Sequence, residues 1–600
     1  MKIILIYPPQ WTPLNPHFSL MSIASQLRQN NHKVEIRDLN IEFYNKILKK
    51  EYLKKSLEKA FKMKEGLFQE LSKKFSPNKK TEQYSENFQK KLAKYTKIKE
   101  TEKNSEENLY IIDSIEEAVS IMKCKTRFYD SDLLIRSLNT IDAALEIASL
   151  PFCPSLLQLH DYNNPFLKLT FESIKKHCLD KSTNMFYEFY EEKISEISYE
   201  SPDIIGISIN SSSQIIPGLT LSMMLKSKTK AHINIGGNFF GRVSETLLNN
   251  TEFFELFAHS LIVEEGEKPI AELVKHLEGK ININEVPNLM YLENKINKIN
   301  FKTEPLTLNE INIQDLEGFP LDAYFTPHIV LSVQSSRGCY WRKCSFCDQD
   351  FGQNSSIKDI DKLFSELKYL KEKFNISHFE FIDESVSPVY LENISKRISE
   401  ENIEINWFIN ARLENAFTHE LLEKTRQAGL RMILWGFESG SNEVMKLINK
   451  GIDLDKRLEI LRDAKEADIW NFVYIFFGFP TETWDDALKT IDIICQNTDI
   501  ISSYGRSVFT LGKHTKLRES CEKYSITKIL ENEEEFSPSY KYETSKGMNS
   551  KEISEAANLC TKICNEAYES PLWMYLRYRE ILFLYICKYG ANIVQKFKKH

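Results

Sequence analysis

The sequence predicts an α/β protein in which a doubly wound, Rossmann-like sheet precedes a partial (β/α)6 barrel. Two observations predict this fold: short apolar strands alternate with amphipathic helices near the N-terminus, and the same alternation returns after residue 325. A third observation is the length of 600 residues, which is too long for a single core. We therefore expect several domains.

Composition and charge narrow the class of protein. The chain is 42% hydrophobic and 27% charged, as in soluble globular proteins, and its net charge of −7 disfavours a general nucleic-acid binder. No apolar run is long enough to span a membrane, and the apolar start ends at two prolines, which predicts a buried strand rather than a signal peptide. Eleven scattered cysteines suggest no disulfide framework and predict a reducing, cytoplasmic location.

The N-terminal sheet is predicted in two parts of the chain. The βαβ pattern begins at the first residues, stops, and resumes near residue 202. We expect strands at residues 2–7, 33–37, 202–209, 232–237 and 261–263, with helices at residues 20–30 and 217–227. These segments form an open parallel sheet, in which ligands bind at the carboxyl ends of the strands.

A helical insertion interrupts this sheet. We assign residues 1–44 and 199–300 to the sheet domain and residues 45–198 to the insertion. Residues 45–110 are rich in Lys and Glu, which is typical of solvated helices, although the Lys surplus could also guide an acidic partner. Residues 130–190 are more apolar and should pack as a helical subdomain.

A partial barrel is predicted over residues 325–515. Six strands are expected at residues 328–333, 378–382, 405–410, 431–437, 472–477 and 501–510. The intervening helices are expected at residues 357–374, 391–401, 419–428, 453–467 and 483–497. The active site of such a barrel lies at the carboxyl ends of its strands.

The last segment, residues 516–600, is predicted to be helical and is rich in aromatic residues. It could form a cap that faces a substrate, and ordinary core packing explains the aromatic residues equally well. These residues are Trp573, Tyr575, Tyr578, Phe583 and Tyr585.

Three cysteines, Cys339, Cys344 and Cys347, lie in one loop after the first expected barrel strand. Three thiolates can bind three irons of a [4Fe–4S] cluster and leave the fourth iron open to another ligand. A zinc site completed by His or Asp is the alternative on the cysteines alone. A second pair, Cys560 and Cys564, has helical spacing and could form half of a metal site, but ordinary helix packing is the simpler interpretation.

Polar motifs follow the next four expected strands in order. Each has a structural interpretation by itself: a carboxylate can cap a helix, and an Arg can form an inter-strand ion pair. Four such motifs at consecutive strand ends are much more informative than one. The candidate ligand-binding residues are Asp383 and Glu384 after the second strand, Arg412 after the third, Glu438 and Ser439 after the fourth, and Gly478 after the fifth.

The cysteine loop, with Phe346 before its last cysteine, and the barrel together resemble the radical S-adenosylmethionine (SAM) superfamily. That family usually has the spacing C-x3-C-x2-C. Here one more residue separates Cys339 from Cys344, which resembles a recurrent variant of the family. The resemblance implies that Cys339, Cys344 and Cys347 hold a catalytic [4Fe–4S] cluster whose open iron chelates SAM. An electron from a flavodoxin- or ferredoxin-type donor would then cleave SAM to a 5′-deoxyadenosyl radical.

The same resemblance implies roles for the strand-end residues. Asp383 or Glu384 would bind the amino group of SAM, and Arg412 its carboxylate. Glu438 and its neighbour Ser439 would face the ribose. Phe346 and Gly478 are also expected to contact the cofactor, with Gly478 on the adenine side.

The N-terminal sheet resembles the cobalamin-binding domain that precedes the barrel in one branch of this superfamily. The implied cofactor-binding residues are Pro8, Pro9, Asn40, Ser208, Gly236, Gly237 and Glu265. The D-x-H-x-x-G motif that supplies an axial histidine in other cobalamin proteins is absent, since no His follows Asp38 closely. A domain that has kept the fold and lost the cofactor is the competing interpretation.

The resemblance implies an enzyme that uses cobalamin to methylate an unactivated carbon of a natural-product or peptide substrate. One alternative is cobalamin-independent radical cyclisation, dehydrogenation or rearrangement. The other is a non-catalytic Fe–S or zinc protein. No nucleic-acid or membrane partner is expected.

Overall fold

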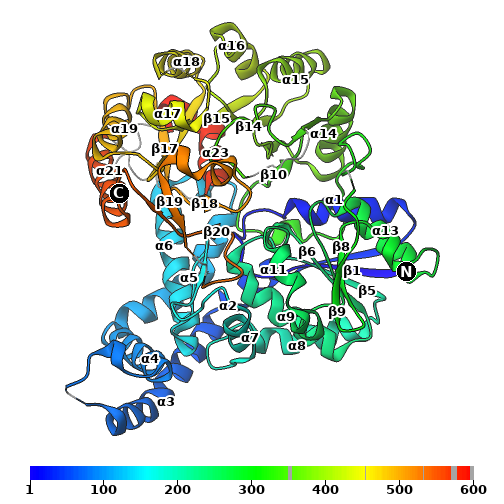
Figure 1. Cartoon of the computed structure of the whole chain (residues 1–600), viewed down its shortest axis with the longest axis vertical. Coiled ribbons are helices and arrows are strands. Elements are labelled where there is room, and N and C mark those ends of the chain that lie inside the picture. Colours follow the sequence, from blue (N-terminus) through cyan, green and yellow to red (C-terminus); the bar gives the residue numbers. More distant parts are fainter. Residues whose placement is uncertain are drawn as a thin grey trace. The chain divides into compact units, whose positions relative to one another are not determined.

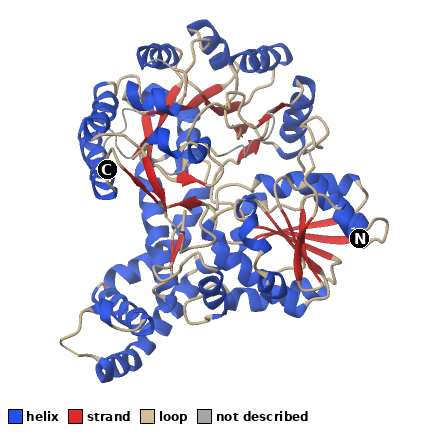
Figure 2. Ribbon diagram, viewed as in Figure 1, coloured by secondary structure: helices blue, strands red, loops and turns tan. Residues whose placement is uncertain are grey.

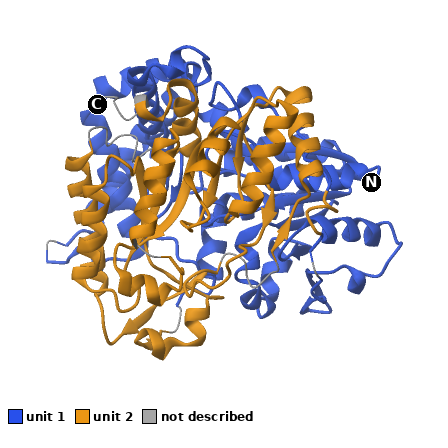
Figure 3. Ribbon diagram, turned by 90° about the horizontal axis from the view of Figure 1, so that it is seen from above, with its two compact units in different colours: residues 1–306, 312–329, 533–536 blue, residues 307–311, 330–532, 537–600 orange. Residues whose placement is uncertain are grey.

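The computed structural model of the chain divides into two compact units, which Figure 3 colours separately. Unit 1 comprises residues 1–306, 312–329 and 533–536, and unit 2 comprises residues 307–311, 330–532 and 537–600. The structure describes residues 1–76, 78–303, 305–348, 355–452, 454–530, 533–568 and 578–594. Trp573, Tyr575 and Asp453, which the sequence analysis includes in expected elements, lie outside these ranges. No described helix is long and apolar enough to cross a bilayer.

Unit 1 contains a seven-stranded sheet with the strand order β2-β1-β5-β6-β7-β8-β9. The five predicted strands are parallel: β1 (Lys2–Tyr7), β2 (Lys33–Asp38), β5 (Ile204–Ser208), β6 (His232–Gly236) and β7 (Ser260–Ile262). The sequence analysis missed an antiparallel extension at one edge, formed by β8 (Leu289–Glu293) and β9 (Ile296–Ile299).

The strands of unit 1 form a sheet because their apolar runs are covered on both faces. Every residue of β1 after Lys2 is buried. Figure 1 shows α1 (Phe18–Gln29) and α13 (Glu267–Leu277) over one face, and α8 (Tyr187–Tyr199) and α9 (Ile215–Lys228) over the other. The chain passes from β1 to β2 on one side, while β5 pairs with β1 on the other. The loops after β1 and β5 therefore lie at a topological switch point, where doubly wound folds bind ligands.

The insertion is helical, as predicted. Its helices are α2 (Leu39–Ile47), α3 (Lys50–Lys74), α4 (Glu86–Lys103), α5 (Ser105–Lys123), α6 (Ser131–Ser149) and α7 (Phe171–Leu179), with a small hairpin of β3 (Leu156–Leu157) and β4 (Tyr162–Asn163). Inter-helix ion pairs join Lys64 to Glu102 at 2.6 Å and Lys97 to Glu146 at 2.8 Å. These contacts support the interpretation of the Lys- and Glu-rich stretch as solvated helical faces.

Unit 2 contains a six-stranded parallel sheet whose strands follow the order of the sequence, as predicted for a partial barrel. The strands are β10 (Val330–Val333), β13 (His378–Phe381), β14 (Asn406–Ala411), β15 (Leu430–Glu438), β16 (Trp470–Phe477) and β17 (Ser503–Val508). The helices between them are α14 (Ile360–Phe374), α15 (Pro388–Glu401), α16 (His419–Gln427), α18 (Leu454–Glu466) and α19 (Trp484–Gln496), with an additional helix, α17 (Asn442–Ile448), before α18. In Figure 2 the helices lie along the outside of the strands.

The segment after the barrel has the predicted helices α21 (Ser550–Ala567), α23 (Arg579–Tyr589) and α24 (Ala591–Val594). The expectation of a helical segment missed two short antiparallel pairs that precede these helices. They are β18 (Leu511–Gly512) with β20 (Ser539–Tyr540), and β19 (Ile526–Ile529) with β21 (Tyr542–Thr544). Phe583 is fully buried and its ring lies 4.9 Å from that of Phe408. Core packing, rather than a substrate-facing cap, therefore accounts for this aromatic residue.

Candidate functional site

The cysteine loop begins immediately after β10 and is anchored by Asp383, which follows β13. The fully buried Asp383 accepts hydrogen bonds from the hydroxyl of Ser335 at 3.0 Å and from the backbone N–H of Ser336. Burial raises the pKa of Asp383. At the base of the loop, β11 (Ser336–Arg337) pairs with β12 (Ser356–Ile357). Asp383 is therefore engaged within the protein, where it holds the start of the loop.

The other predicted carboxylate of this pair, Glu384, is exposed. Partial desolvation raises the pKa of Glu384, and the nearby backbone amide of Gly338 opposes this shift. Gly338 directly precedes Cys339, so Glu384 lies beside the cysteine loop. Of the two candidates, Glu384 has the carboxylate that remains accessible to a ligand.

The cysteine loop is also fixed to the end of α17. The backbone N–H of Ser345 donates to the carbonyl of Ile448 at 2.9 Å, and the Ser345 hydroxyl donates to Leu447 at 2.9 Å. The indole Nε1 of Trp341 donates to the carbonyl of Asn449 at 3.0 Å. All three loop cysteines are half-buried. A half-buried loop held at both sides is suited to binding a cluster.

Charged side chains from different elements lie around Cys344, and two of them, Glu438 and Arg412, were predicted. Burial raises the pKa of Cys344, and the neighbouring charges of Lys450, Glu438 and Arg412 also act on the thiol. Lys450 Nζ lies 2.8 Å from Glu438 Oε1, and both side chains are buried. The sequence analysis missed Lys450. A Lys just after a helix usually interacts with the helix C-terminus, so the sequence carries no signal for this role.

Arg412 follows β14 and has unused hydrogen-bonding capacity. Its side chain is almost fully buried, with the guanidinium carbon 3.8 Å from the ring centroid of Trp341. Nη2 donates to the carbonyl of Lys450 at 3.2 Å, and Nη1 forms an ion pair with Glu414 at 3.5 Å. Among the described residues, Nε and Nη1 have no hydrogen-bond acceptor. Unpaired buried donors are costly, and a carboxylate ligand would satisfy them.

The end of β15 is irregular at Glu438. Its φ of +68° lies in the left-handed region, and the pairing register with β16 shifts between Gly436 and Glu438. The next residue, Ser439, is fully buried, and its hydroxyl accepts a hydrogen bond from the Ser441 N–H at 3.1 Å. The structure therefore places Glu438 beside the cysteine loop, whereas Ser439 stabilises the turn behind it.

The end of β16 brings together Gly478 and Phe346. Gly478 has a φ of +87°, and a Cβ there would lie 2.8 Å from the side chain of Ile553 on α21. The Gly478 N–H donates to the fully buried Glu482, whose pKa is raised to about 7 by burial. The Phe346 ring lies 5.1 Å from that of Phe476. Both predicted residues thus lie on the apolar side of the site.

In unit 1, the predicted residues line the loops at the topological switch point. Asn40 accepts a hydrogen bond from the Trp11 N–H at 3.0 Å and donates to the Trp11 carbonyl at 3.1 Å. Gln214 donates to the carbonyl of Pro8 at 2.9 Å, and both Pro8 and Pro9 are buried. Asn40 and the two prolines therefore shape the loop after β1.

The neighbouring strand ends are more open. The Ser208 hydroxyl lies 3.0 Å from that of Ser19. A Cβ on Gly236 would meet nothing within 4 Å, whereas on Gly237, whose φ is +105°, it would lie 2.3 Å from a backbone oxygen. Glu265 is half-buried in the loop after β7. The open space at Gly236 is a place where a ligand can approach the backbone.

Asp38 stands where a D-x-H-x-x-G motif would begin, but no His follows it closely, and Asp38 has a structural role. It accepts hydrogen bonds from the Ile41 N–H at 3.0 Å and from the Tyr324 hydroxyl at 2.6 Å. Burial raises its pKa to about 6. Since α2 follows Asp38 directly and contains no His, this element supplies no axial imidazole.

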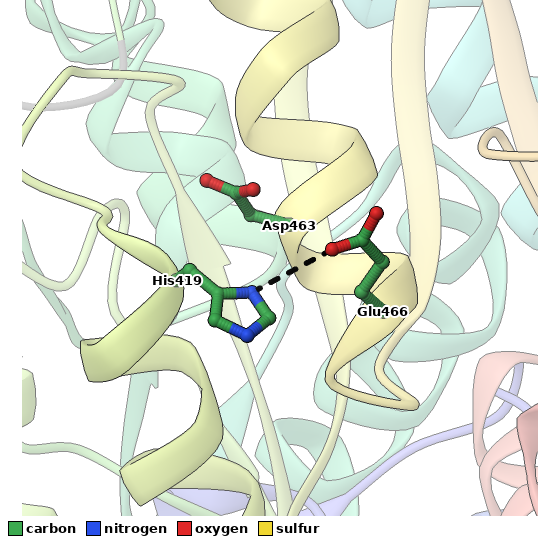
Figure 4. Close-up of side chains that lie close together, drawn as sticks. All are labelled: His419, Asp463 and Glu466. Atoms are coloured by element: carbon green, nitrogen blue, oxygen red, sulfur yellow. Dashed lines mark ion pairs between the residues drawn. The ribbon is translucent and has the colours of Figure 1, made fainter.

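A separate group of ligand-type side chains lies on the helices around the barrel. Figure 4 shows His419 at the start of α16 facing Asp463 and Glu466 of α18. The Nδ1 atom of His419 is 3.9 Å from Glu466, and its Nε2 atom is 3.3 Å from Glu423. Ion pairs at both ring nitrogens account for this partly exposed group, which is not at the strand ends.

The barrel region of the chain is similar to a known family. Residues 333–494 match the family model described as the Radical SAM superfamily. The chain is 26% identical over 299 residues to an uncharacterized methyltransferase of Pyrococcus horikoshii. This match covers 48% of this chain and 63% of that protein. It is 23% identical over 343 residues to 4'-phospho-dehydrooxetanocin synthase of Priestia megaterium, covering 51% of this chain and 44% of the other. The matched regions thus span less than two thirds of these two relatives.

Two solved structures share the fold. The cobalamin-dependent SAM radical enzyme OxsB, solved with aqua-cobalamin, has a TM-score of 0.51 at 18% identity and covers 68% of this chain and 65% of its own. The radical SAM methyltransferase TsrM of Kitasatospora setae was solved with cobalamin and a [4Fe–4S] cluster. It has a TM-score of 0.52 at 12% identity, and the match covers 86% of this chain and 73% of TsrM. This chain therefore contains a radical SAM domain, which implies SAM and a [4Fe–4S] cluster, and has the fold of radical SAM enzymes solved with cobalamin.

Proposed function

We propose that the chain is a cobalamin-dependent radical SAM enzyme that methylates an unactivated carbon of a natural-product or peptide substrate. The observation that carries this proposal is the meeting of Cys344, Glu438, Lys450 and Arg412 at the carboxyl end of the six-stranded sheet. The name of the Pyrococcus relative supports methyl transfer as the reaction class.

The residues of unit 2 fit the implied cofactors. Cys339, Cys344 and Cys347 would hold three irons, because they are half-buried thiols in one fixed loop. The donors of Arg412 that have no acceptor would bind the SAM carboxylate. When bound, the cluster with SAM supplies a carbon radical, and cobalamin supplies a methyl group.

The remaining polar groups would orient SAM. Glu384 is exposed beside the loop and would bind the amino group, while Glu438 would accept hydrogen bonds from the ribose hydroxyls. Lys450 compensates the buried charge of Glu438. On the apolar side, Phe476 and Phe479 are buried and would exclude water from the reacting carbon.

The loops of unit 1 would bind cobalamin. Gly236 leaves the backbone open to a close approach by the nucleotide tail, and Ser208 presents a hydroxyl at the same edge. The shape of the loop after β1 is held by Asn40. Because α2 contains no His, the lower face of the corrin would not be held by an imidazole from that helix.

The test uses anaerobically purified, cluster-reconstituted protein with SAM, a reductant and added cobalamin. We expect a bound corrinoid and the release of 5′-deoxyadenosine, which should stop in the Cys339→Ala, Cys344→Ala and Cys347→Ala variants but continue in Cys521→Ala. The substrate would be found by mass spectrometry of strains with and without the protein and its neighbouring genes. A product that gains a methyl group supports the proposal.

The other outcomes identify the alternatives. Deoxyadenosine with a product that lacks the added methyl would indicate radical cyclisation, dehydrogenation or rearrangement. If the protein bound no corrinoid, the proposal that cobalamin is a cofactor would be wrong. A complete absence of SAM cleavage would indicate a non-catalytic metal protein.

A further inference from the structure

A second group of three cysteines lies in unit 2, on two helices that pack together. Cys495 is on α19, and Cys560 and Cys564 are on α21. The Sγ atoms of Cys495 and Cys564 are 3.3 Å apart, and those of Cys560 and Cys564 are 3.9 Å apart. The sequence analysis recognised only the pair on one helix. The fold brings Cys495 to it from 69 residues away.

The spacing of these sulfur atoms disfavours a tetrahedral metal site. With a zinc–sulfur distance of about 2.3 Å, the thiolates of such a site lie roughly 3.8 Å from one another. Among the described residues, only His419, Asp463 and Glu466 have three ligand atoms that all lie within 4.8 Å of one another. The three cysteines do not meet this criterion, so the sulfurs of Cys495 and Cys560 are more than 4.8 Å apart. The three sulfur atoms therefore do not form the compact triangle of a metal site, and Cys564 is the one that lies close to both others.

The closest pair is instead positioned for a covalent bond. A bonded S–S distance is about 2.05 Å, so the two sulfurs at 3.3 Å need to approach by little more than 1 Å. A side-chain rotation on helices that already pack together supplies such a movement without unfolding either helix. Cys495 is half-buried and Cys564 is buried, so a reagent from solvent reaches Cys495 first.

We propose that Cys495 and Cys564 are a redox-active pair that closes to a disulfide on reaction with a small disulfide oxidant. The sulfur of Cys495, after loss of its proton, attacks the oxidant, forms a mixed disulfide and releases one small thiolate. The sulfur of Cys564, after loss of its proton, then attacks Cys495 and releases the second small thiolate. Two cysteine thiols are oxidised, one small disulfide is reduced to two thiols, and the two protons pass to those thiols.

The surroundings of Cys495 determine the pH dependence of this reaction. Its hydrogen bond with Cys564, followed by burial and the nearby carboxylate of Asp492, raises the pKa of the Cys495 thiol. Tyr504 and Tyr568 are further titratable groups that interact with these thiols. The attacking thiolate is therefore scarce at neutral pH, and the rate of closure should increase as the pH rises.

The disulfide would have a structural consequence near the radical SAM site. It would tie α21 to α19, and α21 carries Ile553, which packs on Gly478 at the end of β16. A cross-link between residues so far apart in sequence lowers the entropy of the unfolded chain. Oxidation should therefore raise the thermal midpoint of unfolding. This inference does not depend on the proposed methylation.

The test uses the full chain with its cluster reconstituted, incubated anaerobically with oxidised glutathione at several pH values. Free thiols are then alkylated, and the digested protein is searched by mass spectrometry for cross-linked peptides. We expect one Cys495–Cys564 peptide that has lost two hydrogens. Cys495→Ser should abolish it, whereas the matched control Cys560→Ser should retain it. The thermal midpoint should rise by several degrees in the wild type and in Cys560→Ser, but not in Cys495→Ser.

Two outcomes would overturn the inference. One is alkylation of Cys564 to the same extent in the oxidised wild type and in Cys495→Ser. The other is a cross-link in which Cys564 pairs with a different cysteine. Iron per chain, measured in every sample, separates this reaction from damage to the cluster, because Cys495→Ser should bind as much iron as the wild type. Cys495→Ala provides a second variant if the serine impairs folding.

Discussion

Lys450 Nζ lies 2.8 Å from Glu438 Oε1, in a buried ion pair that joins the end of α17 to the end of β15. The side chains of both residues are about nine-tenths buried. Removing one partner of such a pair leaves the other charge buried without its ion-pair partner. The pair therefore connects the stability of unit 2 with the position of Glu438, the carboxylate that we propose binds the ribose.

The substitution Lys450→Met should destabilise unit 2 by about 3–5 kcal/mol, because Glu438 is left buried and unpaired. Urea unfolding measures this loss. The exposed Lys446, which pairs with Glu443 at 2.8 Å, provides the control, and Lys446→Met should change little. Adding Glu438→Gln to Lys450→Met should restore much of the stability. A double variant as unstable as Lys450→Met would show that the charge is not the cause.

Arg412→Lys should weaken SAM binding by roughly 10–100-fold, because an ammonium cannot form the bidentate hydrogen bonds that a guanidinium forms with a carboxylate. Equilibrium dialysis with the reconstituted protein measures the dissociation constant. Arg426, in the last turn of α16, pairs with Asp468 at 2.7 Å and is the matched control. Arg426→Lys should leave the constant unchanged, and an equal constant for Arg412→Lys and the wild type would reject the assignment.

Gly236 and Gly237 offer a paired test of the cobalamin site. Gly236→Ala should leave stability unchanged because the added Cβ meets open space, but it should weaken corrinoid binding if the cofactor approaches there. Gly237→Ala should destabilise unit 1 itself, since its Cβ would overlap a backbone oxygen of Ile209. Corrinoid absorbance and thermal unfolding measure the two effects. Unchanged corrinoid binding in Gly236→Ala would place the nucleotide tail elsewhere.

Glu482 should make unit 2 less stable as the pH rises. Its pKa is raised from 4.5 to about 7, so between these values the unfolded chain loses a proton that the folded chain keeps. A shift of this size corresponds to roughly 3 kcal/mol lost across this interval. Glu482→Gln does not titrate, so its stability relative to the wild type should increase from pH 4.5 to 7. Urea unfolding across this range checks the slope, and parallel profiles for the two proteins would contradict it.

Most strands of the two sheets were predictable because they contain buried apolar residues and are bounded by polar or Gly-containing loops. Strand β1, for example, has the bounds that the sequence predicted. The edge pair β8 and β9 was missed because edge strands have mixed polarity, as in Ile296–Ile299. The helix α17 was missed because seven residues are too few to show a helical period.

The site itself was predicted in part. Glu438, Arg412 and Cys344 belong to three motifs that follow strands, and parallel strands bring their carboxyl ends to one edge. The sequence could not show that Asp383 is buried and Glu384 exposed, because two adjacent carboxylates have the same chemistry until the fold buries one of them. Hydrogen bonds within the protein then occupy Asp383.

The sequence alone determined the alternation of strands and helices, the three-cysteine loop and the order of the strand-end motifs, since these depend on local patterns of residue type. Only the tertiary structure decided that Lys450 pairs with Glu438 and that the sulfur of Cys495 lies 3.3 Å from that of Cys564. These partners are 12 and 69 residues apart, and no local pattern links them. Contacts of this kind depend on how helices pack against the sheet, which is set by the shape of the whole core.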